Sequence, residues 1–205
     1  AGALDGGRGE GAVKLLAVGV DYRSAPASVR EALAFDGRKG PDGLDALARA
    51  FPGSEFVVLS TCNRVELYAG GEPEAVPEAD DLTGFLAGFH GVAAETFASH
   101  LVSYHDEGVI GHLFRVSASL ESLVLGEGQI LGQVREAFRA AMDRKVTGPI
   151  LTKLFEHALR VGKKVREDTG MDQGKLSVAS VAVDVARGVF DTFEDKTVLV
   201  IGAGK

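Results

Sequence analysis

The first half of the chain alternates short apolar runs with helical patterns, in the order β-α-β-β-α-β. Four runs have the apolar or alternating character of strands: Val13–Val20, Phe56–Ser60, Arg64–Ala69 and Leu101–Tyr104. Helical patterns lie between them, over Ser28–Phe35, Leu44–Phe51 and Leu82–Phe89. This is the order of a ferredoxin-like domain, in which two helices pack on one face of a four-stranded antiparallel sheet. We therefore predict an α+β fold, with residues 13–104 forming this domain.

Glycine and proline mark where these elements are expected to end. Gly40-Pro41 separates two helical pieces, and Gly70-Gly71 ends the third strand. Residues 1–12 are rich in glycine and contain no apolar core, so we expect a disordered lead-in there rather than a secretory signal. The folded domain is thus expected to begin near residue 13.

The pattern from residue 105 to residue 195 is helical. It includes Gln129–Met142, Ile150–Val165 and Leu176–Phe190, of which the last is expected to be a packed helix. Residues 196–205 are an apolar run that ends in Gly202, Ala203, Gly204 and Lys205. A Rossmann dinucleotide site begins with such a strand and glycine turn, although one G-x-G is a weak signal. We expect a truncated Rossmann domain there, with these last four residues binding the cofactor.

Composition and charge limit the classes of function. A single cysteine among 205 residues excludes an intramolecular disulfide framework and favours a reducing, cytoplasmic setting. Scattered histidines give no metal-ligand spacing, and no apolar run approaches the roughly 20 residues of a membrane span. The net charge of −7 argues against general nucleic-acid binding. Basic residues between Arg144 and Arg166 could contact RNA, but a solvated helix face is the favoured interpretation.

The single cysteine, Cys62, follows an apolar run, at the point where a strand presents its last side chains at the end of a sheet. If the backbone stays extended, Arg64 lies on the same face, because side chains alternate along a strand. A thiol beside a guanidinium has a larger thiolate fraction, which nucleophilic catalysis requires. The alternative is a buried structural cysteine, since free cysteine is among the most buried residue types.

Two motifs carry a resemblance to a known family. Ser60–Tyr68 (STCNRVELY) resembles the active-site signature of the glutamyl-tRNA reductases, and Ser122–Val134 resembles a second block of that family at the expected distance. The resemblance runs from about Lys14 to the last residue. It implies an oxidoreductase in which a cysteine displaces tRNA from glutamyl-tRNA(Glu). NADPH then reduces the thioester to glutamate-1-semialdehyde, the first step of five-carbon tetrapyrrole (porphyrin) biosynthesis.

The resemblance also assigns roles to residues. It makes Cys62 the nucleophile and places His112 beside it. Its substrate-binding residues are Thr61, Asn63, Arg64, Ser122, Glu127, Gly128, Gln129 and Gln133. By this resemblance Arg64 could grip the glutamyl carboxylate in a bidentate pair, and Glu127 could bind the α-ammonium. Without it, Gln129 and Gln133 would be interpreted as the surface of an amphipathic helix, and His112 as a core histidine.

The resemblance further implies a homodimer formed through a domain absent from this chain, transfer of product to glutamate-1-semialdehyde aminomutase, and no contact with a membrane. We expect the chain alone to perform only acyl transfer or an esterase side reaction. One competing hypothesis is a non-catalytic RNA- or protein-binding module, because fold does not fix function. Another is a cysteine hydrolase or acyltransferase that uses Cys62 and His112 as a dyad, although the sequence leaves open whether the two meet.

Overall fold

The computed structural model describes residues 12–123, 128–170 and 178–190, together with residues 192–194, 197 and 199. Several predictions lie outside this part of the chain. They concern the lead-in before residue 12, the substrate residue Glu127, and the cofactor residues Gly202, Ala203, Gly204 and Lys205. The predicted Rossmann strand also falls largely outside it.

Four antiparallel strands form one sheet in the order β2-β3-β1-β4. Their bounds are β1 (Lys14–Asp21), β2 (Glu55–Ser60), β3 (Arg64–Gly71) and β4 (Val102–His105). The two longest strands, β1 and β3, are central, and they pair along their whole length from Lys14 opposite Gly71 to Asp21 opposite Arg64. All four predicted strands are therefore confirmed, with small shifts at their ends.

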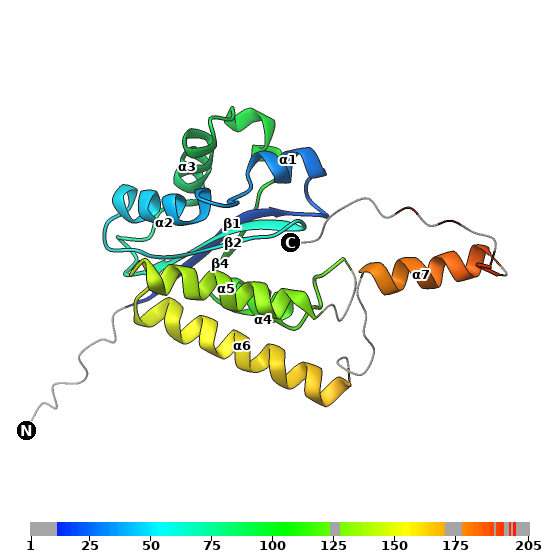
Figure 1. The fold of residues 1–205 in the computed structure, drawn as a ribbon. Coiled ribbons are helices and arrows are strands. Elements are labelled where there is room, and N and C mark those ends of the chain that lie inside the picture. Colours follow the sequence, from blue (N-terminus) through cyan, green and yellow to red (C-terminus); the bar gives the residue numbers. More distant parts are fainter. Residues whose placement is uncertain are drawn as a thin grey trace, which may run out of the picture.

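Helices cover both faces of the sheet, as Figure 1 shows. One layer holds α1 (Ala27–Ala32), α2 (Lys39–Ala50) and α3 (Ala79–His90), and the other holds α4 (Glu107–Ser117), α5 (Gln129–Asp143) and α6 (Pro149–Thr169). Two short 3-10 turns, Ala94–Thr96 and Ala98–His100, precede β4. Strands β1, β2 and β3 are buried along most of their length because helices cover both faces of the sheet, whereas β4 at the edge is largely exposed.

Two expected element ends are wrong. Helix α2 begins at Lys39 and runs through Gly40-Pro41. Proline is tolerated there because the backbone N–H groups of the first helical turn have no partner within the helix. Strand β3 likewise continues through Gly70 and Gly71, and a Cβ on Gly70 would lie 3.1 Å from Leu151 and 3.2 Å from Ile150. Gly70 thus permits the close approach of a helix rather than a turn.

The start of α6 was predicted correctly, and it is fixed by a side chain from the sheet. The helix begins at Pro149, directly after Gly148. The carboxylate of Glu55 on β2 accepts hydrogen bonds from the backbone N–H of Ile150 (3.1 Å) and Leu151 (2.6 Å). An acid at a helix N-terminus satisfies unpaired donors and complements the helix dipole. Strand β2 therefore sets where α6 sits.

Helix α7 (Val178–Val189) confirms the predicted helix but not its packing. Val183, Val185 and Val189 expose 48%, 63% and 71% of their surface. The apolar periodicity gave the right secondary structure, because periodicity alone does not specify what covers the apolar face. None of the helices in the described part of the chain is both long and apolar enough to cross a bilayer.

Candidate active site

Cys62 lies at the tip of the β2–β3 hairpin, where its side chain is exposed. Thr61 closes the turn beneath it. The backbone N–H of Thr61 donates to the carbonyl of Arg64 (2.8 Å), and the Thr61 Oγ1 accepts from the N–H groups of Asn63 and Arg64 (both 3.2 Å). The alternative of a buried structural cysteine is therefore wrong, and the thiol is accessible to a ligand.

The expectation that Arg64 shares a face with Cys62 is also wrong. Residues 62 and 63 lie in a turn, and extended backbone resumes only at Arg64. The Arg64 side chain is only 1% exposed. Its Nη1 donates to Glu66 Oε1 (2.6 Å) and its Nη2 to the backbone carbonyl of Glu121 (2.5 Å). The role of Arg64 in substrate binding stays a prediction.

A different guanidinium reaches the cysteine. Arg30, on α1, donates from Nε to the Cys62 carbonyl (3.2 Å) and from Nη1 to the Ala25 carbonyl (2.6 Å). Arg30, Glu31 and Asp36 line a cavity of about 830 Å³ together with Cys62. Arg30 was not predicted for this site, because nothing in a strand or helix pattern indicates that the first helix contacts the hairpin tip.

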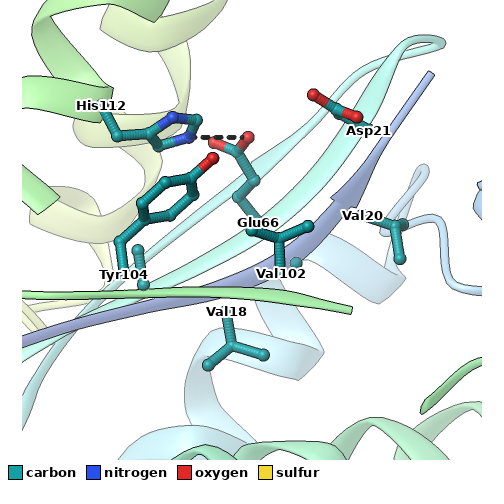
Figure 2. Close-up of a pocket in the computed structure, with 9 residues that line it drawn as sticks. Val18, Val20, Asp21, Glu66, Val102, Tyr104 and His112 are labelled. Atoms are coloured by element: carbon teal, nitrogen blue, oxygen red, sulfur yellow. Dashed lines mark hydrogen bonds and ion pairs between the residues drawn. The ribbon is translucent and has the colours of Figure 1, made fainter. Parts of the chain in front are cut away.

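His112, on α4, lies inside the domain, and Figure 2 shows its ring facing the carboxylate of Glu66. Its Nε2 is 3.1 Å from Glu66 Oε1, and its Nδ1 is 3.1 Å from Glu121 Oε2, the latter a close ionic contact rather than an aligned hydrogen bond. The ring stacks on Tyr104 with a centroid distance of 4.1 Å. Burial lowers the pKa of His112, but Glu121 and Glu66 outweigh this effect and raise the pKa to about 9. His112 is therefore an imidazolium at neutral pH.

Arg64, Glu66, Tyr68, His112 and Glu121 form what we call the buried charge network. Burial alone would raise the pKa of Glu66, but Arg64 and His112 together lower it to about 2. Tyr68 donates from its hydroxyl to Glu66 Oε2 (2.6 Å). At the rim, the guanidinium groups of Arg23 and Arg115 pair with Glu121, and the pKa of that carboxyl is lowered as well.

The sequence held a partial signal for this network. Arg64, Glu66 and Tyr68 alternate along β3, so their side chains share one face of the strand. A polar face on a central strand must find partners, because a buried charge without one is unstable. No comparable signal indicated Glu121, which reaches the network from the loop after α4.

The second motif is divided between the interior and the surface. Ser122 is buried, and its backbone carbonyl accepts a long hydrogen bond (3.5 Å) from the hydroxyl of Tyr22. Gly128 precedes α5, and its carbonyl accepts from Arg166 Nη1 (3.1 Å). Gln133 on α5 lines the Cys62 cavity, which Thr61 and Asn63 also line.

A second cavity adjoins the first along α5. Gln129, Gln133 and Glu136 line one side of this α5 groove, whose volume is about 760 Å³. Phe35, Ser60 and Gln133 line both cavities. Of the predicted site residues in the described chain, Thr61, Cys62, Asn63 and Gln133 thus meet at one cavity and Gln129 lines the next, whereas Arg64 and His112 belong to the buried charge network.

Part of the basic stretch considered for an RNA contact forms bonds within the protein. Lys163 and Lys164 pair with Glu167 (3.5 Å) and Asp168 (2.9 Å) one turn further on. Arg166 points inward and donates to the Ser119 hydroxyl (2.7 Å). Exposed pairs one turn apart are typical of a solvated helix face, and a contact of the stretch with RNA stays a hypothesis. Among the described residues, no group of three histidine, cysteine or acidic side chains is arranged to hold a metal ion.

Known proteins resemble this chain in sequence, in family and in structure. Residues 18–169 match the family model of the glutamyl-tRNAGlu reductase N-terminal domain. The chain is 46% identical over 192 residues to a glutamyl-tRNA reductase of Rubrobacter xylanophilus, covering 93% of this chain and 44% of that protein. It is 42% identical over 193 residues to one of Alkalilimnicola ehrlichii, covering 94% of this chain and 43% of that protein.

A solved structure gives the same result. The glutamyl-tRNA reductase from Methanopyrus kandleri matches with a TM-score of 0.66 and 31% sequence identity, over 93% of this chain and 44% of that one. This chain therefore spans less than half the length of the relatives that it matches. The family model covers most of the chain, and the curated relatives agree in name. The chain belongs to the glutamyl-tRNA reductase family, and residues 18–169 correspond to its N-terminal domain.

Proposed function

We propose that the described part of this chain performs the acyl-transfer half of the glutamyl-tRNA reductase reaction, with Cys62 as the nucleophile. The observation that carries the proposal is the position of Cys62, an exposed thiol at a hairpin tip beside a cavity that Thr61, Asn63 and Gln133 also line. Loops held on a rigid sheet are where catalytic side chains are commonly presented. Family membership supplies the substrate, an aminoacyl ester of tRNA.

In the proposed step, the Cys62 thiolate attacks the carbonyl carbon of the ester that joins glutamate to the terminal ribose of the tRNA. A carbon–sulfur bond forms and the carbon–oxygen bond breaks. The ribose hydroxyl leaves with the proton that the thiol has lost. The products are a glutamyl thioester on Cys62 and free tRNA. A thioester accepts hydride more readily than an oxygen ester, which is the chemical reason for cysteine rather than serine.

The full reaction of the family also requires NADPH, which when bound supplies the hydride that reduces the thioester to glutamate-1-semialdehyde. Gly202, Ala203, Gly204 and Lys205, which the resemblance assigns to this cofactor, lie outside the described residues. What the described residues contribute is therefore the thioester. In the absence of reduction, attack of water on the thioester releases glutamate and restores the thiol, which is an esterase side reaction.

The charges around Cys62 suit a glutamyl group. Arg30 can pair with the side-chain carboxylate of the substrate, and Glu31 and Asp36 on the same cavity can pair with its α-ammonium. The carboxylate-binding role that the resemblance implies for Arg64 would require its guanidinium to exchange its bonds to Glu66 and Glu121 for bonds to the ligand.

The proposal also includes the ferredoxin-like architecture of the domain and its biological setting. The strand order β2-β3-β1-β4, with every pair antiparallel, supports the ferredoxin-like assignment of residues 13–104. Family membership supports a cytoplasmic enzyme of tetrapyrrole biosynthesis. The same resemblance suggests a homodimer that passes its product to glutamate-1-semialdehyde aminomutase.

A cysteine hydrolase with a Cys62–His112 dyad is less well supported. A general base must be neutral at the working pH and within hydrogen-bond reach of the proton that it accepts. His112 has a pKa raised to about 9 by Glu121 and Glu66, which outweigh the lowering effect of burial, and both of its ring nitrogens face carboxylates. In this conformation His112 therefore stabilises the interior rather than activating a thiol.

Mass spectrometry of the protein after brief incubation with glutamyl-tRNA and an acid quench tests the proposal. We expect a glutamyl adduct on the peptide that carries Cys62, and no adduct in Cys62→Ser under the same quench. An unmodified Cys62 with the tRNA still charged would overturn acyl transfer and favour the non-catalytic RNA- or protein-binding module.

A further inference from the structure

One wall of the α5 groove is a face of helix α5 that carries several small residues. Helix α5 buries one stripe against the sheet, which includes Ile130, Val134 and Phe138. The neighbouring stripe faces the groove and includes Gly132 and Gln133. A Cβ on Gly132 would meet no atom within 4 Å. The groove therefore exists partly because α5 carries small residues along this stripe.

The α5 groove adjoins the Cys62 cavity. Its boundary with the Cys62 cavity is formed by Phe35, Ser60 and Gln133, which line both. The backbone N–H of Phe35 donates to the Ser60 hydroxyl (3.0 Å), and the Phe35 ring stacks on Phe89 with a centroid distance of 5.3 Å. Because this boundary is held by packing and a hydrogen bond, a bound molecule could extend from one cavity into the next without displacing it.

The two cavities differ in charge. The Cys62 cavity contains one guanidinium and two carboxylates, from Arg30, Glu31 and Asp36. Among the described residues that line the α5 groove, Glu136 is the one charged side chain, and the amides of Gln129 and Gln133 are the main polar groups. The glutamyl ester of a tRNA has the same two parts. The glutamyl group carries a positive ammonium and a negative carboxylate, and the nucleoside to which it is esterified is uncharged.

We propose that the α5 groove binds the 3′-terminal nucleoside of the aminoacylated tRNA, while the Cys62 cavity holds the glutamyl group. This inference rests on the proposed acyl transfer. A volume of about 760 Å³ lies within the roughly 300–1,000 Å³ range of small-molecule pockets. The apolar walls suit the faces of a base, and the amide and carboxylate groups suit its edge. In this position the nucleoside is the leaving group, so the groove orients the ester toward the thiol.

The test fills the groove and compares two acyl donors. Gly132→Leu places a side chain in the open space, and because glycine is a poor helix former the change does not weaken α5. The donors are glutamyl-tRNA and a small α-thioester of glutamate, which acylates Cys62 by thiol exchange and contains no nucleoside. The rate of adduct formation at Cys62 is measured with each donor by mass spectrometry.

We expect Gly132→Leu to slow acylation by glutamyl-tRNA by on the order of tenfold or more, the effect of a misfitting group in a binding pocket. Acylation by the small thioester should stay within about twofold, since that donor uses only the Cys62 cavity. Gly84→Leu is the control: it makes the same exchange at an exposed glycine of α3, where a Cβ also meets no atom within 4 Å. This control should leave both rates unchanged.

Two outcomes would overturn the inference while leaving acyl transfer intact. In one, Gly132→Leu leaves the rate with glutamyl-tRNA unchanged. In the other, it slows both donors equally, which would indicate a disturbed Cys62 cavity rather than a nucleoside site. Failure of the unsubstituted protein to form any adduct with glutamyl-tRNA would instead overturn the proposed function, and this inference with it.

Discussion

The two halves of the Ser60–Tyr68 motif have opposite environments. Its first residues lead into a turn on which the side chain of Cys62 is exposed. Its later residues enter a central strand, where Arg64, Glu66 and Tyr68 are buried and bonded to one another. Neighbouring residues of one motif thus have different roles. The tip presents a reactive group, and the strand behind it anchors the tip to the core of the domain.

The largest expected effect separates reactivity from stability. Cys62→Ser removes the nucleophile, so we expect loss of the acid-stable adduct by a factor of about 1,000 or more, because a serine hydroxyl without a base is a weak nucleophile. An exposed position away from structural contacts should change the free energy of unfolding by only about 0.5 kcal/mol. Adduct formation and urea unfolding measure the two quantities. A large loss of stability in Cys62→Ser would break the distinction between tip and anchor.

The opposite behaviour is expected at the anchor. Glu66→Ala leaves Arg64 and His112 without their shared carboxylate, and breaking a buried ion pair in this way costs about 3–5 kcal/mol. Urea unfolding followed by circular dichroism measures the loss. Glu74→Gln, an exchange at an exposed acid, is the control and should lie within about 0.5 kcal/mol of the parent protein. Equal stability of the Glu66 and Glu74 variants would contradict the anchoring role.

The pH dependence of stability sharpens the contrast further. Burial lowers the pKa of His112, but Glu121 and Glu66 raise it overall to about 9. The protonated His112 therefore stabilises the fold fully below pH 6.5, and this stabilisation is lost as the pH rises toward 9. Burial raises the pKa of Glu66, but Arg64 and His112 lower it overall to about 2. The ionised Glu66 therefore stabilises the fold above pH 4.5, and this stabilisation is lost as the pH falls toward 2. Stability should therefore be greatest between pH 4.5 and 6.5.

Unfolding experiments at a series of pH values check this expectation. We expect the free energy of unfolding to fall by a few kcal/mol, as an order of magnitude, between pH 6.5 and 9. His112→Gln should remove most of that dependence while leaving the dependence below pH 4.5 attributable to the carboxylates. An unchanged slope above pH 6.5 in His112→Gln would show that His112 is not the group responsible.

The smallest effect is expected at the turn itself. Thr61→Val keeps the shape of the side chain but removes the oxygen that accepts hydrogen bonds from Asn63 and Arg64, at a cost of about 1 kcal/mol. Thr61→Ser keeps that oxygen and should behave like the parent protein. Because the turn positions Cys62, we also expect slower adduct formation in Thr61→Val. A rate equal to that of Thr61→Ser would show that the tip tolerates a looser turn.

The sequence predicted the sheet well because its signal is local. Each strand of the sheet is a short apolar or alternating run, and the order of runs along the chain limits the topology to few arrangements. The ends predicted at Gly40-Pro41 and Gly70-Gly71 are wrong for the same reason, since local rules treat such pairs as breaks in a helix or strand. In the fold, the first pair lies in the opening turn of a helix and the second allows α6 to approach β3.

The candidate site was only partly predictable. Thr61, Cys62 and Asn63 are consecutive, so a correct hairpin places them together, and Gln133 of α5 lines the same cavity, while its role in binding substrate stays a prediction. Which cation accompanies which group depends instead on tertiary contacts. Arg30 comes from α1, while Glu121 draws both Arg64 and His112 into the interior. A sequence pattern gives the charge of each residue but not the partner that neutralises it.

The hydrogen bonds of the turn at Thr61 have a consequence for repeated turnover. Its hydrogen bonds join backbone groups to one another, to the Thr61 hydroxyl and to the Arg30 guanidinium, and among the described residues none of them uses the Cys62 sulfur. Attaching an acyl group to that sulfur, and later removing it, therefore changes no bond on which the turn depends. The turn can therefore keep its hydrogen bonds through repeated cycles of acylation and deacylation of Cys62.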